Sequence, residues 1–232
     1  MTSIIECLFD FTRVLRHTTA ASLADVRRFT DDGDYELIII DNVPTMPIDD
    51  PYKVIRLDQA KVLVNEVDAG CYASLNQGAR VATGDYLLFL QPDVFVHEGW
   101  LKNLRYYIEN NIYDVVFPDQ FPATRKDILE RYEMSYEEAS NHGGRDAGCI
   151  MMTREGFDKT GGWDETMEME YGEAAFYDRI DKAGLRWGCA GKSLVTHIGA
   201  GTKYTMWDLH PEIHIKQMEH DANAWAKIRN PS

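Results

Sequence analysis

The sequence is poor in positive charge. Its 232 residues include 24 Lys and Arg against 38 Asp and Glu, which gives a formal net charge of −14 at pH 7. So acidic a chain disfavours DNA, RNA and anionic membrane surfaces as partners, because each of these is itself negatively charged. A small phosphorylated ligand stays compatible with this charge, since a bound metal ion can supply positive charge locally.

Cysteines are also few, and no two of them form a CxxC pair. They are Cys7, Cys71, Cys149 and Cys189. Free buried thiols in a reducing compartment are the simplest interpretation. The sequence also lacks an apolar run of about 20 residues, the length of a membrane span, and its acidic N-terminal stretch is unlike a signal peptide. We therefore expect a cytoplasmic protein without a transmembrane segment.

What the sequence does contain is ordinary globular material. Hydrophobic residues make up 44% of it, and at this length a full core can be buried without disulfide staples. There is no internal repeat, low-complexity tract or linker, so a single domain over residues 1–232 is expected.

The stretch from Asp85 to Leu101 organises the rest of the chain. Tyr86–Leu90 is an unbroken apolar run, typical of a strand that is covered on both faces. Gly84 and Pro92 bracket it, and Asp93 follows directly. A carboxylate just past the C-terminal end of a buried strand lies where open α/β sheets bind their ligands.

The front half alternates strand and helix patterns. Strands are predicted over Ser3–Phe9, Tyr35–Ile40 and Lys53–Leu57, and helices over Thr12–Phe29 and Cys71–Ala82. This order predicts a parallel sheet with right-handed crossovers. Gly78 in the second helix indicates a close backbone approach there.

The back half is less regular. After a helix from Trp100 to about Asn110, strands are predicted over Asp114–Pro118, Gly148–Thr153, Leu185–Ala190 and Ser193–His197, and helices within Asp127–Glu138 and over Glu173–Ala183 and His210–Ile228. An acidic cluster (Glu165, Glu168, Glu170, Glu173) leads into the helix at Glu173.

Taken in order, these motifs resemble the GT-A-fold glycosyltransferases of the inverting family-2 type. The set comprises YELIIIDN, Asn76 with Gly78, TGDYLLFLQPDV with GWL, GGWDE from Gly161, Glu173 with Arg179, and VTH ending at His197. The resemblance spans Ser3 to about Lys203 and implies an α/β three-layer fold, with a mostly parallel central sheet flanked by helices. It also implies a nucleotide-sugar-binding half (1–115) and an acceptor and catalytic half (116–232).

The resemblance implies a role for each matched position. Leu8, Asp41, Asn42, Asn76 and Gln91 would contact the nucleotide sugar. Asp93 and His197 would hold a divalent metal, Mn²⁺ or Mg²⁺, on the diphosphate. Glu173 would be the general base that deprotonates a hydroxyl of a glycan or lipid-linked acceptor. The donor would be a UDP-, GDP- or dTDP-sugar.

Two positions depart from the family pattern. Gln91 stands where the first aspartate of the DxD motif is usual, and Ala174 follows Glu173 where an aspartate is usual. If the alignment shifts by one residue, the base position holds Ala174. These departures favour the alternative of a catalytically impaired nucleotide-sugar- or glycan-binding module.

Structural roles are open for the same residues. Asp93 could cap the turn after its strand, and Asp41 could be a turn residue. Glu173 could be the acid that a helix N-terminus favours, and His197 could be a structural histidine. A nucleotidyltransferase is a more distant interpretation, because such enzymes carry a Gly- and Arg/Lys-rich loop after the first strand, and Cys7 to Arg16 is not one.

Overall fold

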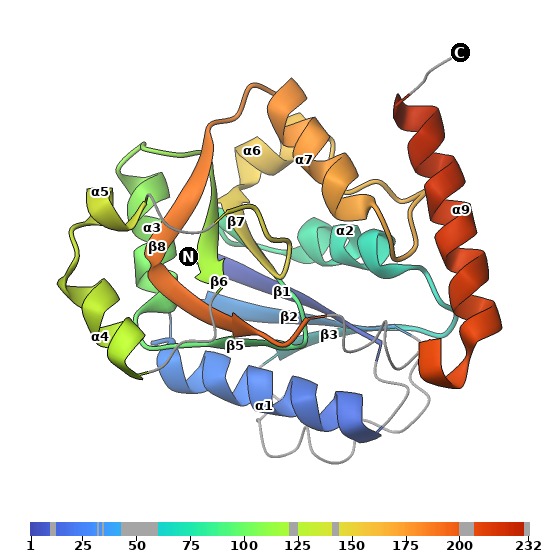
Figure 1. Cartoon of the computed structure of the whole chain (residues 1–232), viewed down its shortest axis with the longest axis horizontal. Helices are drawn as coiled ribbons and strands as arrows, with labels where there is room; N and C mark the ends of the chain where they lie inside the picture. The colour runs from blue at the N-terminus through green and yellow to red at the C-terminus, as the bar shows by residue number, and fades with distance from the viewer. Residues whose placement is uncertain are drawn as a thin grey trace.

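The computed structural model describes residues 1–9, 13–31, 33, 35–42, 60–120, 125–140, 144–199 and 207–229. Within them, one mixed sheet has the strand order β3-β2-β1-β4-β7-β6-β8-β5 (Figure 1). The strands are β1 (Thr2–Leu8), β2 (Tyr35–Asn42), β3 (Ala60–Asn65), β4 (Tyr86–Leu90), β5 (Val94–Val96), β6 (Val115–Gln120), β7 (Cys149–Thr153) and β8 (Trp187–His197). The helices are α1 (Arg13–Phe29), α2 (Cys71–Val81), α3 (Trp100–Glu109), α4 (Arg125–Glu133), α5 (Tyr136–Ala139), α6 (Arg154–Thr160), α7 (Gly172–Lys182) and α9 (Pro211–Arg229).

The predicted parallel sheet is present in the front half. β1 pairs in parallel with both β2 and β4, and β2 pairs in parallel with β3. The strand predicted over Lys53–Leu57 lies outside the described residues. Because these four strands are parallel, their C-terminal ends lie at one edge of the sheet. Leu8, Asn42 and Leu90, the last residues of β1, β2 and β4, are therefore at this edge.

The back half adds antiparallel pairing. β7 runs antiparallel to β4 and β6, and β5 runs antiparallel to β8, whereas β6 and β8 are parallel. The prediction of two strands over Leu185–Ala190 and Ser193–His197 is wrong, since β8 is continuous. The pairing of β8 with β6 shifts register in the middle of β8, where Pro118 pairs with Ala190 and Asp119 with Leu194. In this irregular stretch Gly191 lies directly against the backbone of Ala139. A side chain at that position would collide with this backbone.

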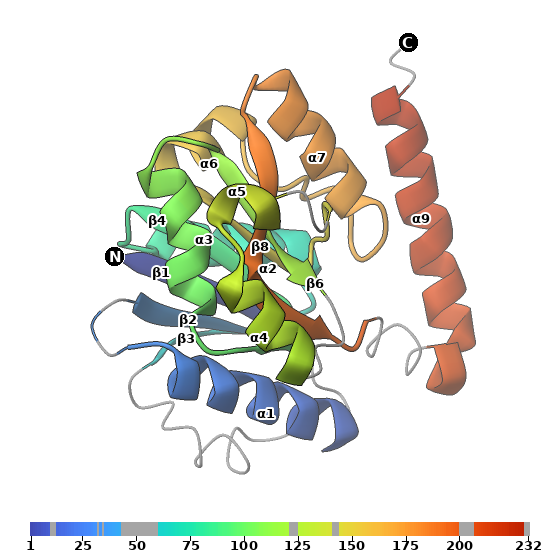
Figure 2. The same ribbon diagram turned by 60° about the vertical axis from the view of Figure 1, so that its left-hand side comes forward.

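Two apolar cores lie on the two faces of the sheet. Alternate β1 residues point to opposite sides, so Ile4 packs with α1 and α3 while Ile5 packs with α2, α6 and α7. Figures 1 and 2 show these helices on either side of the strands. The predicted three-layer α/β arrangement is therefore confirmed.

Helix boundaries follow the sequence closely where the apolar period is strong. α2 begins at the predicted Cys71, and α3 begins at the predicted Trp100. The helix α6 was not predicted, because the REGFDKT segment shows little apolar periodicity. Among the described helices, none is both long and apolar enough to cross a membrane.

Candidate functional site

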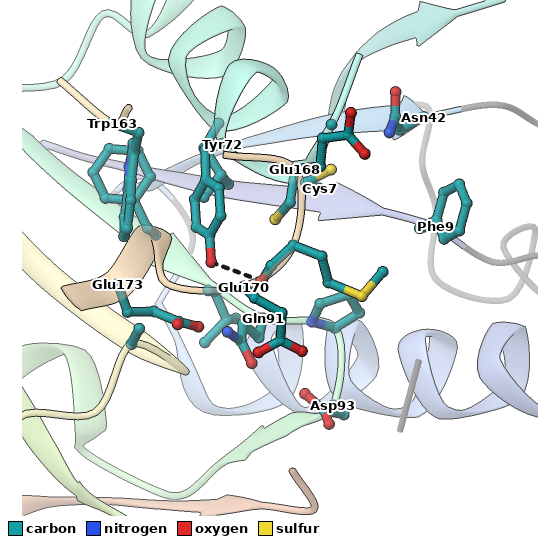
Figure 3. Close-up of a pocket in the computed structure, with 18 of the residues that line it drawn as sticks. Cys7, Phe9, Asn42, Tyr72, Gln91, Asp93, Trp163, Glu168, Glu170 and Glu173 are labelled. Carbon is teal, nitrogen blue, oxygen red and sulfur yellow. Dashed lines mark hydrogen bonds between the residues drawn. The ribbon is translucent and has the colours of Figure 1, made fainter. Parts of the chain in front are cut away.

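A cavity of about 560 Å³ opens at the edge where β1, β2 and β4 end (Figure 3). This volume is within the usual range for small-molecule sites. Its walls come from both halves of the chain: the strand ends, the N-terminus of α2, the segment 145–147, the loop 168–170, the first turn of α7, and α9. The cavity therefore lies at the edge of the sheet that the sequence indicated.

The lining is rich in carboxylates. They are Asp68, Asp93, Asp146, Glu168, Glu170 and Glu173. Among the described lining residues, positive charge can come from Arg145 and His197. Arg145 is already paired with Asp181 and stacks on Trp187, with its guanidinium carbon 3.8 Å from the ring centre. An anionic ligand in this cavity would consequently require an added cation.

Asp93 and His197 meet at the cavity although they are far apart in the chain. β5 and β8 pair antiparallel with Val94 opposite His197, which brings the histidine beside the turn after β4. His197 Nε2 lies 3.2 Å from Asp93 Oδ1, and each side chain is 15% exposed. Nε2 is buried and has no hydrogen-bond partner among the described residues. The contact is therefore an ion pair when His197 is protonated, and Nε2 becomes available to a ligand once it loses that proton.

The other ring nitrogen of His197 is held in place. Nδ1 lies 2.9 Å from Gln120 Oε1 and 3.6 Å from Asp146 Oδ1. Burial by itself lowers the pKa of His197, but the Asp146 and Asp93 carboxylates outweigh burial and raise it to about 9. Holding Nδ1 in this way orients the ring so that Nε2 faces Asp93, which is how metal-binding histidines are commonly fixed.

The Asp93–His197 pair fits two ligands of one divalent ion. Adjacent ligands of an octahedral ion, each about 2.1 Å from it, lie about 3.0 Å apart. The described part of the chain holds no cluster of three or more His, Cys, Asp or Glu side chains able to bind a metal. Substrate oxygens and water would therefore complete the coordination, as is usual for Mg²⁺. His197 would have to release a proton on binding.

Glu173 lies in the first turn of α7 and lines the cavity together with Ala174. Figure 3 shows the Glu173 carboxylate on the Tyr72 side of the cavity, with Glu170 and Gln91 between it and Asp93. Burial and the nearby carboxylates of Glu173 and Glu170 raise the pKa of the Tyr72 hydroxyl. Two carboxylates, not one, are therefore available near this end of the cavity.

Of the predicted contacts at the ends of β1 and β2, Asn42 faces the cavity. Its Nδ2 donates to Asp68 Oδ1 at 2.7 Å, and its Oδ1 accepts from the amide of Ala69 at 3.1 Å. Leu8 and Asp41 are buried and do not line the cavity. Leu8 packs in the core, and its neighbours Cys7 and Phe9 line the cavity instead. Strand alternation explains this, because successive side chains point to opposite faces.

Gln91 lines the cavity, whereas Asn76 does not. Asn76 is 8% exposed. Its Nδ2 donates to the carbonyl of Trp163 at 3.0 Å and to Glu165 at 2.8 Å, and its Oδ1 accepts from the Trp163 amide at 3.0 Å. In this structure Asn76 fastens α2 to the turn at Trp163.

Three residues of the site were missed by sequence reasoning. Tyr72 and Asp146 line the cavity, and Gln120 contacts His197 from outside its lining. None of them carries a motif, and their parts in the site depend on pairing between distant segments. Tyr72 donates to the carbonyl of Met169 at 3.0 Å, which fixes the loop 168–170 against α2 (Figure 3). Asp146 had one available signal, because it lies just before the strand predicted from Gly148 and therefore at a strand end.

Comparison of the sequence with known families gives one match. The family described as Glycosyl transferase family 2 matches residues 13–161. This stretch covers more than half of the chain, so the chain belongs to that family and is a glycosyltransferase of the GT-A fold. The match includes Asp93 and ends before Glu173. No curated protein matches the chain in sequence.

Solved structures agree with this fold. S. aureus TarS (1–349) matches with a TM-score of 0.64 and 11% identity, over 96% of this chain and 70% of that one. GalNAc-T7, crystallised with UDP, GalNAc and Mn²⁺, matches with a TM-score of 0.65 and 17% identity, over 85% of this chain and 43% of that one. At these identities the likeness concerns the fold alone.

Proposed function

We propose that this glycosyltransferase is metal-dependent and moves a sugar from a nucleotide diphosphate sugar to a hydroxyl acceptor with inversion. The donor is UDP-, GDP- or dTDP-linked, and the acceptor is a glycan or a lipid-linked group. The observation that carries the proposal is the Asp93–His197 pair, whose side chains lie 3.2 Å apart in the lining of a carboxylate-rich cavity. The UDP and Mn²⁺ of the GalNAc-T7 crystal structure support it by analogy of fold.

Asp93 and His197 would hold the ion. A divalent metal there neutralises the charge that grows on the departing diphosphate. The carboxylate suits Mg²⁺ and Mn²⁺ alike, while the imidazole favours Mn²⁺. Asn42, with Cys7 and Phe9, forms the end of the cavity assigned to the nucleoside.

Glu173 is the proposed base. An acceptor hydroxyl must lose its proton as it attacks the sugar carbon, and a carboxylate within hydrogen-bond reach can accept that proton. With one base and no enzyme nucleophile, a single displacement inverts the anomeric centre. Glu170 is the second carboxylate at this end of the cavity, so the assignment can be tested against a close neighbour.

Calorimetric titration with UDP, GDP and dTDP tests the donor site. We expect one of the three to bind in the presence of Mn²⁺, and binding to be lost after chelation or in Asp93→Ala. Binding that ignores both metal and Asp93→Ala would refute the metal site. If no nucleotide binds under any condition, the donor site itself is refuted.

Glu173→Gln, with Glu170→Gln as the matched control, tests the base. Both substitutions remove one charge from the same wall and preserve side-chain size. We expect Glu173→Gln to lower kcat about 10²-fold or more with nucleotide binding unchanged, and Glu170→Gln to lower it far less. The reverse order would transfer the role of base to Glu170, and unchanged rates in both variants would refute a carboxylate base at this wall.

A further inference from the structure

The C-terminal helix α9 has one fully buried carboxylate. α9 lies beside the body of the molecule, near the loop before α7 (Figures 1 and 2). The buried residues on this helix are His214 and Asp221, and Asp221 is 0% exposed. A buried charge is costly unless it is fully bonded. Its position therefore calls for specific partners.

Asp221 binds three consecutive backbone amides. Its Oδ1 accepts from Glu168 N at 3.0 Å, and its Oδ2 accepts from Met169 N at 2.8 Å and from Glu170 N at 2.7 Å. Burial alone favours the neutral acid, but these amides hold the pKa of Asp221 below its usual value. The carboxylate thus fixes the backbone of the loop 168–170, whose three residues all line the cavity.

The opposite side of this loop is bonded to the nucleoside end of the cavity. The amide of Cys71 donates to the carbonyl of Glu168 at 3.1 Å. A few residues earlier, Asp68 accepts from both Asn42 and the Gly70 amide. The loop is consequently held between α9 on one side and the ends of β2 and α2 on the other.

A second contact ties α9 to the residue that follows the loop. Tyr171 stacks on Trp225 with ring centres 6.5 Å apart and an angle of 12° between the planes. Tyr171 has a φ of 58°, an uncommon left-handed conformation for a residue with a side chain. It also precedes α7, whose first turn carries Glu173. Through this contact α9 also braces the residue before the first turn of α7.

Gln217 lies one helical turn before Asp221 and on the same face of α9. It lines the cavity, and its Oε1 is buried without a hydrogen-bond partner among the described residues. A buried amide oxygen without a partner is unfavourable. A hydroxyl or N–H of a bound ligand would satisfy it.

We propose that α9 forms a wall of the nucleoside end of the donor site, with Gln217 accepting a hydrogen bond from the nucleoside. Asp221 is the positioning residue that fixes the loop 168–170 along the cavity. The inference rests on the proposed donor site and adds to it a helix that lies entirely outside the family match at 13–161. Nucleotide recognition would then depend on a C-terminal element as well as on the strand ends.

The test uses three variants of the full chain: Gln217→Ala, Asp221→Asn and Glu219→Gln. Glu219→Gln is the matched control, because it removes one charge from an exposed position of the same helix. The probes are UDP, GDP and dTDP with Mn²⁺, titrated calorimetrically. Melting temperature and hydrogen exchange of the amides 168–170 are measured on the same samples.

We expect Gln217→Ala to weaken binding of the preferred nucleotide roughly five- to tenfold without a change in melting temperature. In Asp221→Asn the side-chain NH₂ opposes the loop amides, so exchange at 168–170 accelerates and binding weakens at least tenfold. Glu219→Gln behaves as the unaltered chain.

Unchanged affinity in Gln217→Ala refutes the nucleoside contact, and unchanged exchange in Asp221→Asn refutes the positioning role. If Asp221→Asn fails to fold, Gln217→Ala still decides the role of the wall. If the unaltered chain binds none of the three nucleotides, the proposed donor site fails, and the present inference fails with it. If the unaltered chain binds a nucleotide normally and the variants bind it equally well, only the present inference fails, and the proposed donor site stands.

Discussion

Gly78 in α2 is the position where the packing makes the sharpest prediction. A Cβ placed there would lie 2.9 Å from Cδ1 of Ile40 and still closer to Cγ2 of Ile5. Both isoleucines are 0% exposed and belong to adjacent parallel strands, so neither can move away freely. Substitution by alanine therefore forces α2 away from the sheet.

The two energetic effects of Gly78→Ala oppose each other. Alanine is about 1 kcal/mol better than glycine inside a helix, and overpacking a well-filled core costs about 1–3 kcal/mol. With branched, fully buried neighbours we expect the clash to dominate and the free energy of unfolding to fall by about 1–2 kcal/mol. For a chain of this size the melting temperature should fall by about 2–8 °C.

Urea and thermal unfolding of Gly78→Ala measure this effect, with Gly144→Ala as the control. Among the described residues, no heavy atom lies within 4 Å of a Cβ added at Gly144, and its φ is not left-handed, so its substitution should be neutral or slightly stabilising. If Gly78→Ala were as stable as the unaltered chain, the close approach of α2 to the sheet would not constrain this position.

Two further predictions concern the turn at Trp163 and its surroundings. Asn76→Ala should leave the Trp163 amide and carbonyl without their side-chain partner. We expect the free energy of unfolding, measured in urea, to fall by about 2 kcal/mol. A selective loss of nucleotide affinity at unchanged stability would instead make Asn76 a donor contact. Asp164 is 8% exposed and binds Arg179 at 2.7 Å and the Thr166 hydroxyl at 2.6 Å. Although burial opposes ionisation, these partners hold its pKa below the usual value, so its contribution to stability is present above pH about 4 and is lost as the pH falls through the lower folded-state pKa. Asp164→Asn should flatten that acid limb of the stability curve, and an unchanged limb would contradict the assignment.

Local patterns predicted much of the fold. The apolar runs at Ile4, Ile38 and Leu88 correspond to three neighbouring strands of the sheet, because a strand covered on both faces needs uninterrupted hydrophobic residues. The helical spacing of Leu23, Val26 and Phe29 likewise predicted the helix α1. The prediction failed at α6, where periodicity is weak, and at Gly191, where a glycine suggests a break although β8 continues through it.

The site was less predictable from the sequence than the fold. The placement of Asp93 just after β4 could be read from the sequence, because the end of a buried strand is a local feature. Asn76 matches a family motif, yet its contacts hold Trp163 and Glu165 in place. The roles of Glu173 as base and of Asp93 and His197 as metal ligands stay predictions, and the measurements proposed above test them.

The sequence by itself determined the class of fold, the strand that delivers Asp93, and the acidic character that requires a cation for an anionic ligand. Tertiary structure alone decided which distant residues meet. The antiparallel pairing of β5 with β8 brings His197 to Asp93, and the docking of α9 brings Asp221 to the loop 168–170. Such contacts depend on strand register and helix packing between segments that are remote in the chain, whereas hydrophobic periodicity reports only the local face that each segment buries.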